Sequence, residues 1–301
     1  MEFASLARPT LLTLAALLWV AIVAGCATAP LSPTAPSSVA AFSSATPQGA
    51  LPVGWGERRL SRFKKETAYR LVADATGITV IEARAEQSAS GLAKTLDIDP
   101  VLTPWIRWRW QVPSLIQGAD NTSRHAEDAP VRVIVTFAGD MNTLDFEERA
   151  MAARVKALTG QTMPYATLMY IWENKATLGE IIESPHTSRV KMIVAETGAT
   201  RSRAWLDYER HIIRDFEKAF GEKPKRILSV GIMTDTDNTG ETATAYYGDI
   251  RFTRESVLLL AGPTTMSPQP SPTTTNTANA ANTQSAANTA DATSTPTTKA
   301  N

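Results

Sequence analysis

Cysteine is almost absent from this 301-residue sequence, in which Cys26 is the only one. No disulfide can therefore form within the chain. The sequence has only three histidines, and His125, His186 and His211 are far apart in sequence, with no pair at a metal-binding spacing. It also lacks the glycine patterns of nucleotide-binding loops and the Gly-x-Ser-x-Gly elbow of many hydrolases. Thirty basic residues balance thirty acidic ones, so the overall charge does not favour nucleic acid as a partner.

The N-terminus has the features of a bacterial export signal. An apolar run from Leu11 to Val23 is too short to span a bilayer but suits a signal peptide. The next residues complete "VAGC", which resembles a lipobox, so we expect cleavage after residue 25 and lipidation of Cys26. An ordinary secretory signal with an incidental cysteine is the alternative. Because Ala27 and not aspartate follows, the resemblance implies a lipid anchor in the outer membrane, facing the periplasm.

Composition divides the chain into four parts. Residues 1–25 are the predicted signal peptide, and residues 26–50, rich in Ala, Ser, Pro and Thr, are predicted to form a disordered tether. Residues 262–301 are a Thr-, Ala-, Asn- and Pro-rich tail that we also expect to be disordered. The remaining residues, 51–261, are enough for a single domain with a complete core.

The dominant pattern within this domain is an alternation of period two, which is typical of half-buried strands. Two segments break it and resemble helices, one from Asp145 to Gly160 and one over residues 203–220. The sequence thus predicts a mainly β fold, a β-sandwich or jelly roll with one or two flanking helices. The segments expected to form strands are 78–86, 105–112, 131–137, 168–174, 189–196, 227–233 and 242–252.

Several of these segments also resemble a known family. The run "FEKAFGEKPKRILSVGIMTDTDNTGETATAYYGDIRF" from Phe216 to Phe252 is similar to the domain-of-unknown-function 3047 family of exported bacterial proteins, with support from "LTPWIRWRWQVPSL" at Leu102. No activity is assigned to that family, so the resemblance implies none for this chain. A weaker similarity connects the last two strands to galactose-binding-like jelly rolls, among them carbohydrate-binding modules. Those modules usually end in two aspartates where this chain has Gly248 and Asp249.

The loop "MTDTDNTGE" from Met233 places two aspartates, an asparagine, a glycine and a glutamate between two apolar segments. Alternate carboxylates in a tight loop can converge on calcium, so the candidate metal ligands are Asp235, Asp237, Asn238 and Glu241. The twelfth position of an EF-hand would be Tyr246, which excludes that motif. A polar turn bonded to nearby amides is the alternative interpretation, and the one that the residues favour. Paired carboxylates are also the minimum for a glycan-acting hydrolase using residues 235–241.

The aromatic strand "WIRWRWQV" offers a binding site on one of its faces. Alternation places Trp108 and Trp110 on the core face and leaves Trp105, Arg107 and Arg109 on the other as candidate ligand contacts. Two arginines on one strand face suit an acidic glycan, although a solvated face with ion pairs is the alternative. We therefore expect non-catalytic binding of an envelope glycan or envelope protein, with the hydrolase or a purely structural lipoprotein as alternatives.

Overall fold

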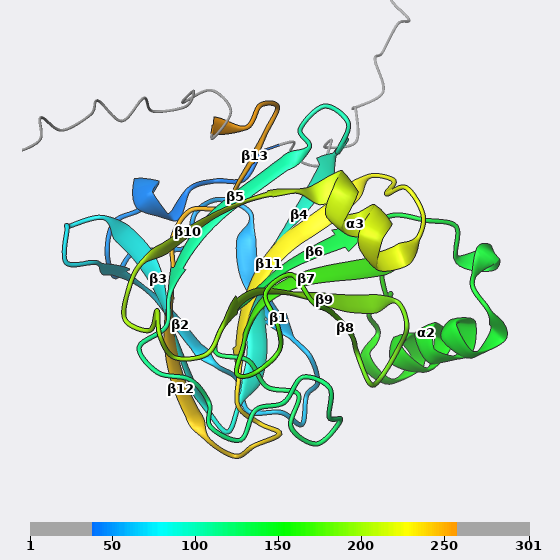
Figure 1. Ribbon diagram of the computed structural model, residues 1–301, viewed down its shortest axis with the longest axis horizontal. Coiled ribbons are helices and arrows are strands. Elements are labelled where there is room, and N and C mark those ends of the chain that lie inside the picture. The colour runs from blue at the N-terminus through cyan, green and yellow to red at the C-terminus, as the bar shows by residue number, and fades with distance from the viewer. Residues whose placement is uncertain (1–37, 258–301) are drawn as a thin grey trace, which may run out of the picture. The chain divides into compact units, whose positions relative to one another are not determined.

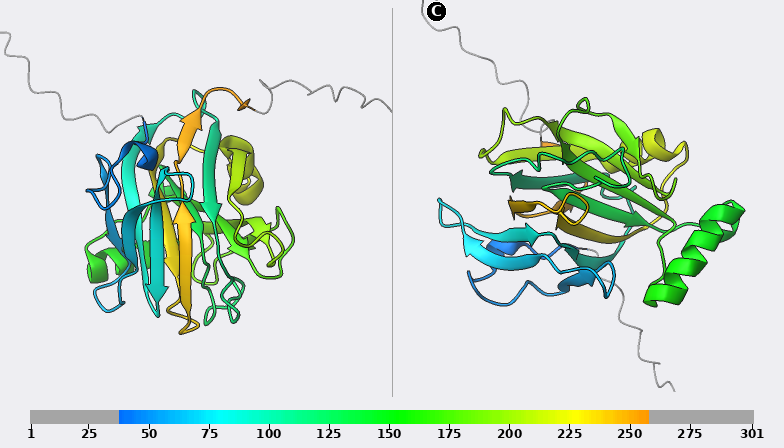
Figure 2. Two further views of the ribbon diagram at one scale, coloured as in Figure 1. Left: turned by 90° about the vertical axis from the view of Figure 1, so that its left-hand side faces the viewer. Right: turned by 90° about the horizontal axis from the view of Figure 1, so that it is seen from below.

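The alternating segments form strands in two sheets that pack face to face (Figures 1 and 2). The structure is a computed structural model, and it describes residues 38–257. The seven-stranded sheet has the order β1 (Trp55–Arg59), β4 (Ala89–Ile98), β11 (Ile227–Asp235), β6 (Arg132–Phe137), β7 (Ala166–Glu173), β9 (Val190–Thr197) and β8 (Ile181–Glu183). The six-stranded sheet has the order β10 (Leu206–His211), β5 (Trp105–Gln111), β12 (Thr242–Tyr247), β3 (Thr79–Glu86) and β2 (Ala68–Ala73), with β13 (Arg251–Thr253) also paired to β5.

Neighbouring strands are antiparallel except β7 and β9, which are parallel. The inner faces of both sheets supply the core. Trp108 and Trp110 of β5 are 3% and 0% exposed, as their alternation predicts. The ring of Trp108 stacks on Tyr170 of β7 with centroids 4.6 Å apart, which joins the two sheets. The predicted fold class, a mainly β sandwich with two helices, is confirmed.

The first predicted helix is present as α2 (Phe146–Thr159). Its N-cap Asp145 accepts a hydrogen bond from the Glu148 amide at 2.8 Å, and Gly160 ends it with a left-handed φ of 73°. No described side chain of α2 is buried. Figure 2 shows the helix standing out from the side of the sandwich.

The second predicted helix, over residues 203–220, is only half correct. Residues 206–211 form strand β10, which pairs with β5, and the helix α3 (Ile212–Phe220) begins after it. Leu206 is buried opposite Trp110. The apolar spacing of the whole segment fits a helix, but pairing with the aromatic strand determines the structure of its first half.

The packed part of the chain begins earlier than Leu51, where we expected the domain to start. A short 3-10 helix, η1 (Phe42–Ser44), lies in the segment assigned to the tether. Phe42 is fully buried, and its ring centroid lies 4.7 Å from the ring centroid of Trp55. The indole of Trp55 also donates to the Ala40 carbonyl at 3.0 Å, and Ser43 donates to Asp249, so this segment is bound to the body of the sandwich.

The predicted signal peptide, Cys26 and the C-terminal tail lie outside the described residues. Within residues 38–257, the two helices are too short and too polar to cross a bilayer.

Candidate functional site

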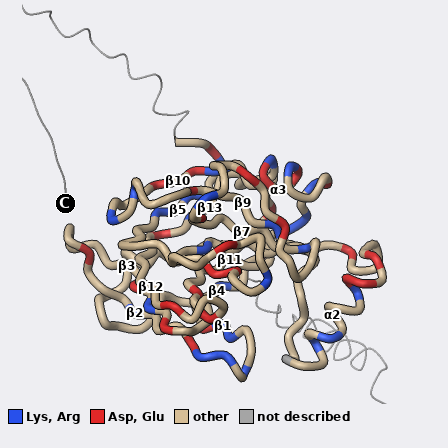
Figure 3. Tube along the Cα trace, turned by 60° about the horizontal axis from the view of Figure 1, so that its bottom comes forward, with Lys and Arg blue, Asp and Glu red and all other residues tan. Residues whose placement is uncertain are grey.

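The outer face of β5 carries the predicted arginines, and β10 supplies acidic partners beside them. The register places Arg107 opposite Glu209 and Arg109 opposite Asp207. Strand β13 adds Arg251, which lies opposite Arg107 on the other side of β5. Basic residues of β5 therefore face acidic residues on β10 and a basic residue on β13, and Figure 3 shows both charge signs around β5, β10 and β13.

A groove of about 480 Å³ lies on this face, within the size range of small-molecule sites. Segments distant in sequence build it: η1, the start of β3, β5, β10 and the turn from β12 to β13. Its polar lining comprises Ser43, Thr79, Arg107, Arg109, Asp207, Tyr208, Glu209, Asp249 and Arg251. Three guanidinium groups thus share the groove with three carboxylates.

Contacts with neighbouring residues hold the two β5 arginines in place. Nε of Arg107 lies 2.8 Å from the carboxylate of Glu209, whose side chain is only 5% exposed. Arg109 lies 3.8 Å from the carboxylate of Asp74, and its guanidinium stacks 4.0 Å from the ring centroid of Trp205. The alternative we left open, a face of ion pairs, is therefore present, and it fixes the arginines at the groove.

The groove carboxylates with a resolved shift have lowered pKa values. Burial acts to raise the pKa of Glu209, but hydrogen bonds from Ser256 and the Val257 amide, with the Arg107 guanidinium, hold it below its ordinary value. At Asp249, burial also acts to raise the pKa, but hydrogen bonds from Ser43 and Arg251 hold it below its ordinary value. These groups are ionised at neutral pH and act as hydrogen-bond acceptors.

Trp105, the third predicted contact, lies on the same face but beside the groove. Its ring packs edge-on against His211 of β10, with centroids 4.9 Å apart. The described groove lining does not include it. Sequence reasoning missed Glu209, Asp249 and Arg251, because β10 was assigned to a helix and β13 was merged with β12.

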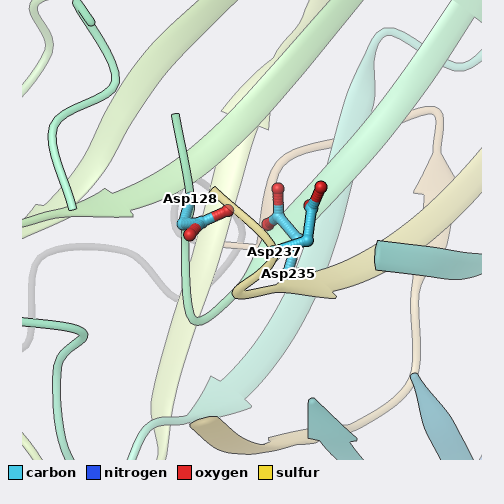
Figure 4. Close-up of side chains that lie close together, drawn as sticks. All are labelled: Asp128, Asp235 and Asp237. Carbon is cyan, nitrogen blue, oxygen red and sulfur yellow. The ribbon is translucent and has the colours of Figure 1, made fainter. Parts of the chain in front are cut away.

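The acidic loop after β11 has a different arrangement from the predicted metal site. Oxygens of Asp128, Asp235 and Asp237 lie within 4.8 Å of one another, and Figure 4 shows the three side chains gathered at the end of β11. Glu241 is not part of this cluster, because it accepts hydrogen bonds from the amides of Gln117 and Gly118.

Protein donors satisfy most of the loop's polar groups. Asp128 accepts from the amides of Asn238 and Thr239 at 3.3 and 2.7 Å, and the Asn238 side chain donates to the Arg124 carbonyl. Asp237 lies 2.6 Å from the ammonium group of Lys64. The loop is thus bonded to residues 117–132 as well as to itself.

Asp235 is the buried centre of this arrangement. Nε and Nη2 of Arg132 lie 3.0 and 3.2 Å from its two oxygens, and the Ala129 amide donates to it at 3.1 Å. The side chains of Arg132 and Asp235 are 2% and 4% exposed. Burial raises the pKa of Asp235 to about 6, although the Arg132 guanidinium acts to lower it.

Asp128, Asp235 and Asp237 are the carboxylates that could ligate a cation here. Arg132 and Lys64 already balance two of the three charges, so a divalent ion would have to compete with the Lys64 ammonium for Asp237. No spacing rule in the sequence identifies Asp128, because it reaches the loop from a segment more than 100 positions away.

The fold and the groove define a β-sandwich protein with a polar site on the outer face of one sheet. The family described as "Protein of unknown function (DUF3047)" matches residues 53–251, and the chain belongs to that family. A search of curated proteins found no match.

Solved structures similar to the chain include the enzymatically active domain of tailspike protein 4 from bacteriophage CBA120, with a TM-score of 0.33 at 6% identity. The alignment covers 67% of this chain and 19% of the tailspike chain. A xylan-binding module, CBM15, has a TM-score of 0.26 at 12% identity over 67% of this chain and 93% of its own. A loop-swap mutant of Necallimastix patriciarum Xyn11A has a TM-score of 0.27 at 6% identity, with 67% and 90% covered. All three TM-scores are below 0.5, so the description of the fold rests on the two sheets themselves.

Proposed function

We propose that the protein is a lipid-anchored envelope protein that binds a glycan, without cleaving it, in the groove on the six-stranded sheet. The observation that carries the proposal is the fixed position of the arginines. Glu209 and Trp205 each hold one guanidinium at the groove. A guanidinium has five donors, and these contacts leave several of them for a ligand. Polar groups fixed before binding lose little conformational entropy when they bind.

The charge of the groove favours a ligand different from the acidic glycan suggested by the strand alone. Glu209 already neutralises Arg107, and Asp207 and Asp249 add further negative charge. Three guanidinium groups that donate hydrogen bonds and three carboxylates that accept them suit vicinal hydroxyl groups, which both donate and accept. We therefore expect a neutral or zwitterionic glycan of the cell envelope to bind better than a strongly acidic one.

Binding is favoured over hydrolysis by the pKa values of the carboxyl groups. A glycosidase needs one carboxyl group that stays protonated as the general acid. Glu209 and Asp249, in the groove, have pKa values shifted in the opposite direction. Asp235 has a raised pKa, but it is buried and paired with Arg132, so a polysaccharide does not reach it.

Membrane attachment belongs to the same proposal and rests on the sequence around Cys26. This residue stands 12 positions before residue 38, the first described one. A chain of that length spans at most about 40 Å when fully extended. An anchor at Cys26 would thus keep the groove close to the envelope layer at which the protein is attached.

The test uses residues 27–301, which contain the whole described body, and a panel of immobilised envelope glycans. Asp207 and Arg251 are exposed groove residues, so replacing each by alanine should leave the fold intact. Loss of one charge-assisted hydrogen bond should weaken binding roughly tenfold. Glu57→Gln, an exposed carboxylate on β1 of the other sheet, is the control and should bind normally.

Two results would contradict the proposal. Retention that is unchanged in both groove variants would move the ligand to another surface. New reducing ends that appear with the wild-type protein and disappear with Asp207→Ala would show that the groove hydrolyses the glycan.

A further inference from the structure

A strongly basic segment follows β1, at the edge of the seven-stranded sheet. Residues 58–65 read "RRLSRFKK", with five basic residues in eight positions and no acidic one. Arg58 and Arg62 are exposed and have no ion-pair partner in the described part of the chain. Arg59, Lys64 and Lys65 pair with Glu66, Asp237 and Glu86. Arg58 and Arg62 therefore stay outside the ion pairs that the rest of the segment forms.

Helix α2 brings further basic residues to the same region. The side-chain amide of Gln161, just after the helix, donates to the Arg59 carbonyl at 3.2 Å. The acidic residues of α2 lie in its first turn, whereas Arg154 and Lys156 lie in its second half. Figure 3 shows basic residues on α2 and on the segment that follows β1. We call residues 58–65 and 154–158 together the basic patch.

Large apolar side chains are exposed within this patch. Phe63 is 81% exposed and Leu158 is 76% exposed, and Leu60 is 42% exposed. The guanidinium carbon of Arg62 lies 4.7 Å from the Phe63 ring centroid, so charge and aromatic ring are presented together. Exposed apolar groups surrounded by Lys and Arg are typical of surfaces that lie at a membrane interface.

We propose that the basic patch binds the surface of a bilayer that contains anionic lipids. The positive charges attract the anionic headgroups, and the side chains of Phe63 and Leu158 enter the boundary between headgroups and acyl chains. A soluble polyanion would pair with the charges but would leave both apolar side chains in water. The bilayer is the partner that takes both kinds of group. This contact is separate from the anchor predicted at Cys26 and from the groove.

The experiment measures binding of residues 27–301 to vesicles of phosphatidylcholine, with and without 30% phosphatidylglycerol. This chain lacks Cys26 and its lipid, so the patch is tested without the anchor. Arg58→Glu together with Arg62→Glu should raise the lipid concentration needed for half-maximal binding at least tenfold, because each basic residue near an anionic surface contributes roughly fivefold.

The matched control is Lys223→Glu together with Lys225→Glu. Both lysines are exposed and precede β11, which begins at Ile227 opposite Ile98 of β4. Arg59 lies opposite Ser90, at the other end of β4. The control therefore makes the same charge change near the opposite end of β4 from Arg59 and should leave vesicle binding unchanged.

A second measurement separates a membrane from a soluble polyanion. Residues 27–301 contain no cysteine, so Phe63→Cys can carry a single solvent-sensitive dye. We expect its emission to shift to the blue with anionic vesicles and to stay unchanged with heparin. Equal binding to both vesicle types, or a dye that stays in water when the protein is bound, would overturn the proposal. The circular dichroism melting curve of each variant should match that of the parent chain, since the substituted side chains are exposed.

Discussion

Replacing Arg132 by methionine should lower the free energy of unfolding by about 3–5 kcal/mol, because it leaves a buried carboxylate without its counter-charge. The side chains of Arg132 and Asp235 are 2% and 4% exposed, and two nitrogens of the arginine lie 3.0 and 3.2 Å from the two carboxylate oxygens. Asp235→Asn should cost a similar amount, since it isolates the arginine instead. In a domain of this size, 3 kcal/mol corresponds to roughly 6–12 °C in Tm.

The double variant Arg132→Met with Asp235→Asn should be much less unstable than the sum of the single variants. Removing both charges removes the cost of burying them, and the asparagine oxygen can still accept the hydrogen bond from the Ala129 amide. Urea unfolding of the four proteins gives a coupling energy, which we expect to exceed about 2 kcal/mol. Lys64 and Asp237 form a more exposed pair, at 39% and 19%, and their cycle should give less than about 1 kcal/mol.

The pH dependence of the same proteins checks the physical cause. The pKa of Asp235 is about 6 in the folded protein and about 3.9 in an unfolded chain. Between pH 4 and 6 the folded state binds more protons at this group, so the free energy of unfolding falls as pH rises through that window. Without Arg132 the folded pKa rises further and the window extends above pH 6. The cost of Arg132→Met should therefore be larger at pH 7.5 than at pH 5, by about 1.4 kcal/mol for each additional unit.

Two outcomes would refute this reasoning. Additive single costs would mean that the two side chains do not stabilise each other, whatever their distance. A cost of Arg132→Met that is the same at pH 5 and pH 7.5 would mean that the Asp235 carboxylate reaches water once its partner is removed.

Three further predictions concern the other candidate residues. Cys26→Ser should abolish incorporation of radioactive fatty acid and leave the precursor uncut, whereas label in the variant would contradict the lipobox. If calcium binds at the acidic cluster, calcium at a hundredfold excess over Kd adds about 2.7 kcal/mol to the free energy of unfolding and raises Tm by several degrees. A chelator should reverse this rise, and Asp237→Asn should remove it. A Tm that stays constant would mean that the loop is a turn whose charges are balanced by protein cations. Arg107→Ala should cost about 1–2 kcal/mol in urea unfolding, because Glu209 is 5% exposed and loses its guanidinium; no change would show that water replaces the arginine.

The strands with apolar and polar residues in alternation were predictable, and they supply most of the core. Strand β4 was not, although it lies next to β11 in the seven-stranded sheet. Its sequence "ASGLAKTLDI" has small residues where the backbone of β11 approaches, and a Cβ on Gly91 would lie 2.6 Å from the Ile232 carbonyl oxygen. It also buries Lys94, which donates to the Val53 carbonyl at 2.6 Å. Small and charged residues in a buried strand give no periodic signal.

The candidate site was partly predictable for a similar reason. Alternation within β5 correctly placed Arg107 and Arg109 on the outer face, because a single strand carries that information. Their partners come from β10, β13 and the turn after β2, and strand pairing decides which residues meet. The acidic loop shows the same limit. The spacing of its carboxylates suggests metal ligands. The structure shows in addition that Asp128 and Arg132, from a distant segment of the chain, bond to residues of the loop.

The groove and the basic patch occupy different sheets, and this separation allows both to act at once. The groove lies on the outer face of the six-stranded sheet, whereas the patch follows β1 at the edge of the other sheet and includes the end of α2. A bilayer that contacts Phe63 and Leu158 covers the side from which α2 projects (Figure 2). We therefore expect the arginines of β5 that we assign to glycan binding to stay open to solvent when the patch is bound. The two surfaces therefore differ in charge. Among the described residues, the patch has basic residues without an ion pair, whereas the groove has ion-paired residues of both signs.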